Sequence, residues 1–268
     1  MTQRIAILGA GVMGETLLSA ILSSGHPVDH LVISERRDDR AAELREAYGV
    51  EVTGNAEAAA GADVVLLVVK PQDVPALLQE IAGSVAPGTT VVSLAAGIRI
   101  EAIASALPDG VAIVRAMPNT PALVGEGMFG ISPAPAVTEE QLAAVVTLLE
   151  SGGKVVVVEE ALQDAVTAVS GSGPAYVFYL AEAMIAGGVA EGLDPETARI
   201  LAQQTLVGSA KLLAGSEETA EELRRRVTSP NGTTHAAITT FDERGVKAGL
   251  VAGVAAAAAR SAELSAPQ

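Results

Sequence analysis

The sequence predicts an α/β protein in which a doubly wound domain is followed by an all-helical domain. Through about residue 160, short β-branched runs alternate with amphipathic helical stretches, as expected for a parallel sheet and its covering helices. Several runs, such as VVLLVV at 64–69, are apolar at every position, which is typical of strands covered by helices on both faces. Beyond that point the strand signals stop, and Ala-rich helical patterns continue to Leu264. We therefore expect two domains, at 1–160 and 161–268.

The predicted strands of the first domain are short and have helical stretches between them. They cover Arg4–Leu8, Leu31–Ser34, Asp63–Val69, Thr89–Leu94, Val111–Arg115 and Lys154–Val158. The charge-rich stretch RRDDRAAELREAYG at 36–49 predicts an exposed helix. The proline-rich segment ISPAPAVT at 131–138 predicts a loop within the same domain.

Composition narrows the classes of ligand. Of the 268 residues, 49% are hydrophobic but only 2% aromatic, so the core must consist of Ala, Val, Ile and Leu. The net charge of −15, without a local basic patch, argues against nucleic acid or an anionic membrane as partner. With no Cys and three scattered His, we expect no disulfide and no metal site.

The chain shows no targeting or spanning signal. Its first residues, MTQRIAILGAG, lack the basic, apolar and cleavage regions of a secretion signal in order. The most apolar C-terminal stretch, Ala248 to Ala259, has 12 residues, fewer than the roughly 20 that a membrane-spanning helix needs. We therefore expect a cytoplasmic protein.

A glycine array lies between the first strand and the first helix. In RIAILGAGVMGETLLSAIL, Gly9, Gly11 and Gly14 form a G-x-G-x-x-G pattern in a strand–turn–helix context. Gly9 permits the tight turn, Gly11 lets the backbone approach a pyrophosphate, and Gly14 lets the helix pack on the strand. The helix N-terminus offers N–H groups to the anion. We therefore expect a Rossmann domain that binds a dinucleotide, with a merely structural glycine turn as the alternative.

The end of the second strand carries conflicting coenzyme signals. Glu35 follows the loop by about 20 residues, where a carboxylate grips the ribose 2′-hydroxyl of NAD. Ser34, Arg36 and Arg37 instead suit the 2′-phosphate of NADP. Alternatively, the two arginines simply begin an exposed helix. We favour NADP(H), with NAD(H) as the alternative.

Two further turns are expected to face the coenzyme, because ligands of doubly wound sheets bind beyond the carboxyl ends of the strands. One contains Val69, Lys70 and Pro71, and the other contains Ala95, Ala96 and Gly97. Small residues there leave room for the coenzyme, although a plain strand-to-helix turn has the same composition.

The stretch VTSPNGTTHAAITTFD at 227–242 is rich in hydroxyl groups and poor in charge. Pro230 and Gly232 predict a helix N-terminus whose backbone donors can bind a carboxylate without any charged side chain. Thr234 adds a hydroxyl for a polar substrate atom. Equally, Ser229 or Thr233 can merely cap the helix. His235 is a candidate general acid, but a lone His on a helix is more often packed or solvated.

Together, these segments resemble pyrroline-5-carboxylate reductase over essentially the whole chain. The resemblance is carried by ILGAGVMGETLLSAIL, the VKP and SLAAG turns, IVRAMPNTPALVGEGM at 113–128, SGSGPAYVFYLAEAM at 170–184, and the stretch at 227–242. In the last, Thr228, Ser229, Asn231, Gly232, Thr234, Ala237, Ile238 and Phe241 are all of types that the family signature permits. Asn231 stands where many relatives have Gly, and Asn tolerates left-handed backbone angles.

The resemblance implies a reaction and a set of site residues. NAD(P)H would give a hydride to the C=N bond of 1-pyrroline-5-carboxylate, making L-proline in the last step of proline biosynthesis. Thr234 would hydrogen-bond the ring nitrogen as the catalytic residue. The implied substrate site comprises Met117, Pro118, Asn119, Ser229, Gly232, Thr233 and Thr234. Including Asn55 at the adenosine ribose, the expected coenzyme site comprises Gly9, Ala10, Gly11, Val12, Met13, Gly14, Ser34, Arg36, Arg37, Asn55, Val69, Lys70, Pro71, Ala95, Ala96 and Gly97.

The resemblance also implies that the helical domain mediates dimerisation. Segments such as GLVAGVAAAAARSAEL present Ala and Gly faces that bury little area within one subunit, so we expect a homodimer, with further assembly of dimers left open. Two alternatives remain. A β-hydroxyacid dehydrogenase would need a base, commonly a Lys that is absent from ALQDAVTAV and YVFYLAEAM. A non-catalytic NAD(P)-sensing protein would keep the fold without turnover.

Overall fold

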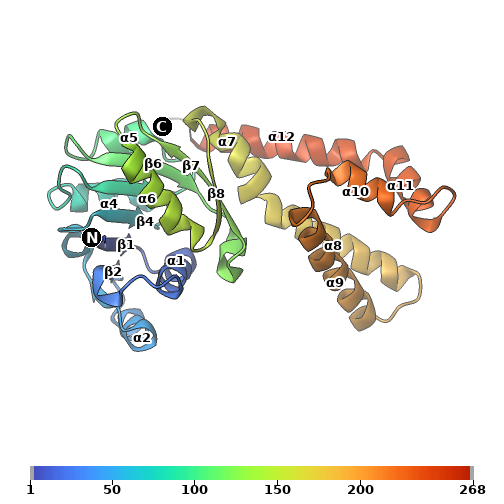
Figure 1. Cartoon of the computed structure of the whole chain (residues 1–268), viewed down its shortest axis with the longest axis horizontal. Helices are drawn as coiled ribbons and strands as arrows, with labels where there is room; N and C mark the ends of the chain where they lie inside the picture. Colours follow the sequence, from blue (N-terminus) through green and yellow to red (C-terminus); the bar gives the residue numbers. More distant parts are fainter. Residues whose placement is uncertain (1–2, 266–268) are drawn as a thin grey trace. The chain divides into compact units, whose positions relative to one another are not determined.

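The chain consists of two compact units, which are described separately (Figure 1). The computed structural model describes residues 3–265. The first unit comprises Met1–Ser172 and Ala257–Gln268, and the second comprises Gly173–Ala256. The division therefore falls at Ser172, and the last helix contributes residues to both units.

An eight-stranded sheet forms the centre of the first unit, in the order β3-β2-β1-β4-β5-β6-β7-β8. Its strands are β1 (Ile5–Leu8), β2 (Leu31–Ser34), β3 (Glu51–Thr53), β4 (Val64–Leu67), β5 (Thr90–Ser93), β6 (Ala112–Met117), β7 (Gly127–Pro133) and β8 (Gly153–Val157). Neighbouring strands are parallel except for β6 and β7, which pair antiparallel with Val114 opposite Pro133. Since the order reverses at β1, the sheet is doubly wound, and the predicted fold class is confirmed.

Two hydrophobic clusters cover the two faces of this sheet. Along β1, Ile5 and Ile7 belong to one cluster, and Ala6 and Leu8 belong to the other. All four are fully buried, which explains why such strands are apolar at every position. Helices α1 (Val12–Ser23), α2 (Asp38–Tyr48) and α6 (Glu139–Glu150) contribute to the first cluster, and α3 (Asn55–Ala59), α4 (Val74–Ile81) and α5 (Ile100–Ala104) to the second.

The loop predicted at 131–138 is wrong in part. Residues 131–133 end strand β7, which the sequence pattern did not reveal because it contains two glycines and a terminal proline. Gly130 is required there, since a Cβ at this position would overlap the side chain of Val166. Pro133 is the last residue of the strand, a position that proline tolerates. Strand β3 also escaped prediction because it has only three residues.

The rest of the chain is helical, as predicted. After η4 (Glu160–Leu162) come α7 (Gln163–Val166), the π-helical turn η5 (Thr167–Gly171), α8 (Gly173–Ala190), α9 (Pro195–Ala214), α10 (Ala220–Arg226), α11 (Thr233–Glu243) and α12 (Val246–Leu264). The second unit buries few apolar side chains: on α9 only Ala198 and Ala202 are buried. Within residues 3–265, none of the helices combines the length and the apolarity needed to cross a membrane.

Candidate functional site

The loop between β1 and α1 forms a cradle that only glycine permits at two positions. Gly9 has a φ of +113°, and a Cβ on it would lie 2.5 Å from the carbonyl oxygen of Val68 on the neighbouring chain segment. A Cβ on Gly14 would overlap the carbonyl oxygen of Gly9. Gly11, by contrast, has open space where its Cβ would be, with no atom within 4 Å. That space lies above the helix N-terminus, so the loop fits a bound pyrophosphate.

The start of helix α1 has donors without acceptors. Gly11 is its N-cap and provides no side-chain cap, and the first closed helical bond is made by Glu15 to the Gly11 carbonyl. Among the described residues, the N–H groups of Val12, Met13 and Gly14 have no acceptor. Ala10 is buried, and the Val12 side chain is exposed. An anion can satisfy these donors.

A chain of hydrogen bonds links this loop to the end of β2. The Ser34 hydroxyl accepts from the N–H of Gly9 at 3.3 Å and donates to Oδ1 of Asn55 at 2.6 Å. Asn55 in turn donates from Nδ2 to Oε2 of Glu80 at 2.9 Å. Ser34 and Asn55 are both buried. The structure thus brings together three of the predicted coenzyme residues, Gly9, Ser34 and Asn55, and adds Glu80, which the sequence did not indicate.

Glu35 is bound to its own backbone neighbours. Its Oε1 accepts from the N–H groups of Arg36 at 2.8 Å and Arg37 at 3.0 Å, and from Nε of Arg37 at 3.5 Å. Burial by itself would raise the pKa of Glu35, but these hydrogen bonds from Arg37 and Arg36 outweigh it and hold the pKa below its usual value. One oxygen of the carboxylate that would favour NAD is therefore engaged locally, while Arg36 and Arg37, which pair with Glu80 and Glu35, have side chains that are 79% and 65% exposed.

The other two predicted coenzyme turns differ in their surroundings. Lys70 and Pro71 are exposed, with Lys70 preceding η2 (Pro71–Asp73). Gly97 has a φ of +77°, and its Cβ position lies 3.4 Å from Oγ of Ser265 at the end of α12. Ser261 on α12 donates to Asp164 at 2.6 Å, which anchors the end of this helix to α7. The turn at 95–97 is therefore packed against the C-terminal helix, which the sequence did not indicate.

The segment after β6 contacts the π-helical turn η5. Nδ2 of Asn119 donates to the carbonyl oxygen and hydroxyl of Ser170 at 3.3 and 3.2 Å, and its Oδ1 accepts from the N–H of Met128 at 2.8 Å. A Cβ on Gly171 would lie 2.5 Å from Cε of Met117. Met117 and Asn119 thus meet Ser170 and Gly171, and π-helical turns are frequent at functional sites. The amide of Asn119 thus links the segment after β6 to Ser170 and to Met128 at the start of β7.

In the second unit, the N-terminus of α11 has the form expected of a carboxylate site. Its N-cap is Gly232, without a side-chain cap, so the interpretation of Ser229 or Thr233 as a helix cap is wrong. A Cβ on Gly232 would lie 2.5 Å from Oγ of Ser229. Asn231 has a φ of 59°, and this left-handed residue turns the chain into the helix. In the described part of the chain, the N–H groups of Thr233, Thr234 and His235 have no acceptor.

Within the described residues, the hydroxyls of Thr233, Thr234 and Thr239 on α11 make no hydrogen bond, and of these three Thr234 alone is partly buried. Thr228 donates to the carbonyl of Arg224 at 2.6 Å, and Thr240 donates to that of Ala236 at 3.0 Å. The Thr234 hydroxyl, by contrast, is available to a ligand. His235 is exposed, as the solvated interpretation expects.

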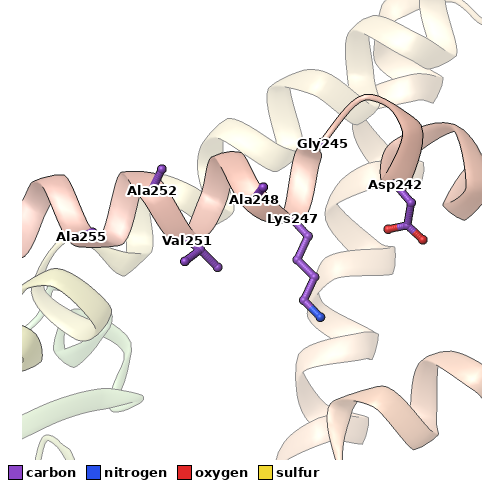
Figure 2. Close-up of a pocket in the computed structure, with 7 residues that line it drawn as sticks. All are labelled: Asp242, Gly245, Lys247, Ala248, Val251, Ala252 and Ala255. Atoms are coloured by element: carbon purple, nitrogen blue, oxygen red, sulfur yellow. The ribbon is translucent and has the colours of Figure 1, made fainter.

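A groove along the surface of α12 has a different character (Figure 2). It has a volume of about 550 Å³ and is lined by Asp242, Gly245, Lys247, Ala248, Val251, Ala252 and Ala255. Four of these are small or branched apolar side chains on successive turns of one helix. Apart from Asp242 and Lys247 near one end of α12, the lining side chains are apolar or absent, and such a surface fits an apolar helix face.

Comparisons with known proteins agree with both units. Residues 160–264 match a family model described as pyrroline-5-carboxylate reductase dimerisation, and residues 4–97 match one described as NADP oxidoreductase coenzyme F420-dependent. The chain is 42% identical to a pyrroline-5-carboxylate reductase of Mycobacterium tuberculosis, covering 97% of this chain and 96% of that protein. The chain belongs to the pyrroline-5-carboxylate reductase family. The family predicted from the sequence is thereby confirmed.

Solved structures of this family agree over the whole chain. The pyrroline-5-carboxylate reductase of Coxiella burnetii superposes with a TM-score of 0.95 at 32% identity, covering 100% of both chains. A pyrroline carboxylate reductase of Plasmodium falciparum, solved with NADP bound, has a TM-score of 0.85 at 26% identity and covers 98% of both chains. Family membership decides against a β-hydroxyacid dehydrogenase.

Proposed function

We propose that the chain reduces 1-pyrroline-5-carboxylate to L-proline with a hydride from a reduced nicotinamide coenzyme, the last step of proline biosynthesis. The observation that carries the proposal is the N-terminus of α11. In a chain of this family, it combines three unpaired backbone N–H groups with the free hydroxyl of Thr234. A biosynthetic reductase that draws on the cell's reduced coenzyme pool belongs in the cytoplasm.

The coenzyme site is proposed at the β1–α1 loop and the end of β2. The open space at Gly11 and the free N–H groups of α1 suit the pyrophosphate. Asn55 and Ser34 suit the adenosine ribose, while Val69–Pro71 and Ala95–Gly97 flank the remaining coenzyme. NADPH is preferred, because one oxygen of Glu35 accepts from the backbone, and the exposed guanidinium groups of Arg36 and Arg37 can turn from Glu80 and Glu35 to a 2′-phosphate. When bound, the reduced nicotinamide supplies the hydride.

The substrate carboxylate is held by the N–H groups at Gly232–Thr234, with Ser229 shaping the turn. The hydroxyl of Thr234 donates to, or accepts from, the ring nitrogen and so orients the C=N bond for attack at its carbon. Met117 and Pro118 are assigned to substrate binding by the family resemblance, and Asn119 holds their segment in place through Ser170. Because an iminium carbon is already electrophilic, the protein mainly needs to orient the reactants and exclude water, which can contribute roughly 7 to 11 kcal/mol.

The second unit is proposed to pair with that of another copy. It leaves many apolar side chains more than one-third exposed: Val177, Phe178, Leu180, Met184, Val189, Ile200, Leu201, Val207, Leu212, Phe241, Leu250 and Val251. Its alignment with the dimerisation model and the apolar groove of Figure 2 support burial of this surface in a homodimer. We also propose that these dimers can associate into larger oligomers.

The test is oxidation of NADPH and NADH in the presence of pyrroline-5-carboxylate, with wild type, Thr234→Ala and Thr240→Ala. Thr234→Ala should lower kcat/KM by roughly 10- to 100-fold, because it removes a hydrogen bond to the reacting group, while the coenzyme Kd stays unchanged. Thr240→Ala is the matched control, since its hydroxyl is bonded within α11. An unchanged rate in Thr234→Ala contradicts its role, and an inactive wild type contradicts the function.

A further inference from the structure

The hydrogen-bond chain beyond Asn55 ends on a carboxylate that no part of the proposed function uses. Glu80 lies near the end of α4, and its Oε2 accepts from Nδ2 of Asn55 at 2.9 Å and from a guanidinium nitrogen of Arg36 at 3.2 Å. These partners are 25 and 44 residues away along the chain. Both are residues proposed to hold the ribose and the 2′ position of the coenzyme. Glu80 therefore contacts two sides of this subsite.

Glu80 determines which way the amide of Asn55 faces. An ionised carboxylate only accepts hydrogen bonds, so the NH₂ end of Asn55 must face Glu80 and the oxygen end must face Ser34. The Ser34 proton is thereby committed to Asn55, and its oxygen receives the N–H of Gly9. Asn55 keeps one N–H free, which is a donor for a ribose or phosphate oxygen. The donor and acceptor directions along these hydrogen bonds, from Gly9 through Ser34 to Asn55, therefore depend on the Glu80 carboxylate at their end.

Glu80 also balances the charge at the end of β2. Arg36 is paired with Glu80, and Arg37 with Glu35, so two guanidinium groups face two carboxylates. A 2′-phosphate either displaces the Glu80 carboxylate from Arg36 or lies next to that negatively charged carboxylate. A ligand with a 2′-hydroxyl meets no such opposition. The repulsion is moderate, because the Glu80 side chain is 40% exposed and partly screened by water.

We propose that Glu80 is a specificity-determining residue of the coenzyme site. It orients Asn55 for either coenzyme. Its charge weakens the binding of NADPH relative to NADH, and so reduces the preference for NADPH that Arg36 and Arg37 create. This inference rests on the proposed function, because it places the adenosine 2′ position at Arg36 and Asn55. It assigns Glu80 a role in discriminating coenzymes and none in hydride transfer.

The experiment measures the Kd of NADPH and of NADH by titration calorimetry for wild type, Glu80→Gln and Glu80→Ala. Glu80→Gln keeps an oxygen that can accept from Asn55 but removes the charge. NADPH should therefore bind roughly 3- to 10-fold more tightly, NADH should be nearly unchanged, and the gain should shrink at high salt. Glu80→Ala also removes the partner of Asn55, so it should bind NADH more weakly than Glu80→Gln does. Glu80→Asp keeps the charge and should not show the gain in NADPH binding.

Glu57→Gln is the matched control, because it removes an exposed carboxylate from α3 near Asn55. An unchanged ratio of the two Kd values in Glu80→Gln would overturn the inference. An equal gain in Glu57→Gln would overturn it as well, since only the net charge would then matter. A wild type that binds neither coenzyme overturns the proposed coenzyme site and the role of Glu80 with it, whereas normal binding with an unchanged ratio overturns the role of Glu80 alone.

Discussion

The end of β2 and the N-terminus of α11 are two candidate anion sites built by opposite means. At the end of β2, the charged side chains of Glu35, Arg36 and Arg37 are already paired. At the start of α11, residues 229–234 carry no charged side chain, and backbone donors stand without acceptors. One site balances full charges against each other, and the other relies on the partial charges of a helix end.

The difference follows from what each site has to hold. A 2′-phosphate lies far from the chemistry and in contact with water, where exposed charges cost little free energy. A substrate carboxylate lies close to an imine that becomes positive when protonated. A Lys or Arg there would repel the iminium, whereas backbone N–H groups bind the carboxylate without adding a positive charge. The absence of charge in the hydroxyl-rich turn is thus part of the proposed chemistry.

The largest effect is expected in the glycine loop, which adjoins the end of β2 through the hydrogen bond from the N–H of Gly9 to Ser34. Gly14→Ala should destabilise the protein by about 3 kcal/mol and abolish coenzyme binding, because the new methyl group overlaps the Gly9 carbonyl. Gly11→Ala should leave the melting temperature unchanged yet weaken coenzyme binding at least roughly 10-fold, because its Cβ enters open space that the pyrophosphate needs. Thermal melts and calorimetry check both. Normal coenzyme binding by Gly11→Ala would contradict the assigned pyrophosphate site.

On the uncharged side, the second unit should depend on a partner chain. Val251→Asp places a carboxylate in the apolar groove of α12 and should dissociate the dimer, at a cost of about 3 kcal/mol. Light scattering coupled to gel filtration measures the mass, and the melting temperature of the wild type should rise with protein concentration. Ala76→Asp, on an exposed position of α4, is the control. A wild type that remains a folded monomer would disprove the pairing.

At the end of β2, Arg36 and Arg37 are expected to decide between NADPH and NADH. Replacing both Arg36 and Arg37 with Ala should weaken NADPH roughly 10-fold and NADH much less, because only NADPH carries the 2′-phosphate. The Kd values of the two coenzymes measure this directly. Equal weakening of both would assign the ribose 2′-hydroxyl to Glu35 and indicate NAD as the preferred coenzyme.

The smallest effect concerns the pH dependence of stability. Hydrogen bonds from Arg37 and Arg36 hold the pKa of Glu35 in the folded state below its usual value. This carboxylate therefore stabilises the folded state at pH values above its unfolded pKa of about 4.3. The stabilisation is lost as the pH falls through the lowered pKa of the folded state. Glu35→Gln should therefore be less stable than wild type by about 1 kcal/mol at pH 7. Urea unfolding should show this difference shrinking below about pH 4.3. A pH-independent difference would contradict the ionic origin.

Much of the fold could be predicted because it is encoded in local patterns. Apolar runs such as Val64–Leu67 identify buried parallel strands, since consecutive residues enter the two clusters on opposite faces. The glycine array identifies the loop, because the positive φ of Gly9 and the contact of Gly14 with the Gly9 carbonyl are local, whereas the contact of Gly9 with Val68 was not predictable. Strands β3 and β7 escaped because a three-residue strand and a strand with two glycines have no distinctive period.

By itself, the sequence determined the order of elements, the family, and the residues that can bind phosphate or carboxylate, since these depend on near neighbours and on residue chemistry. Only the tertiary structure decided how those residues are used. It brought Asn119 to Ser170, Asn55 to Glu80 and Arg36 to Glu80, across 51, 25 and 44 residues. The physical reason is that a hydrogen bond between distant residues depends on where the sheet order places their elements, and no period or spacing along the chain carries that information.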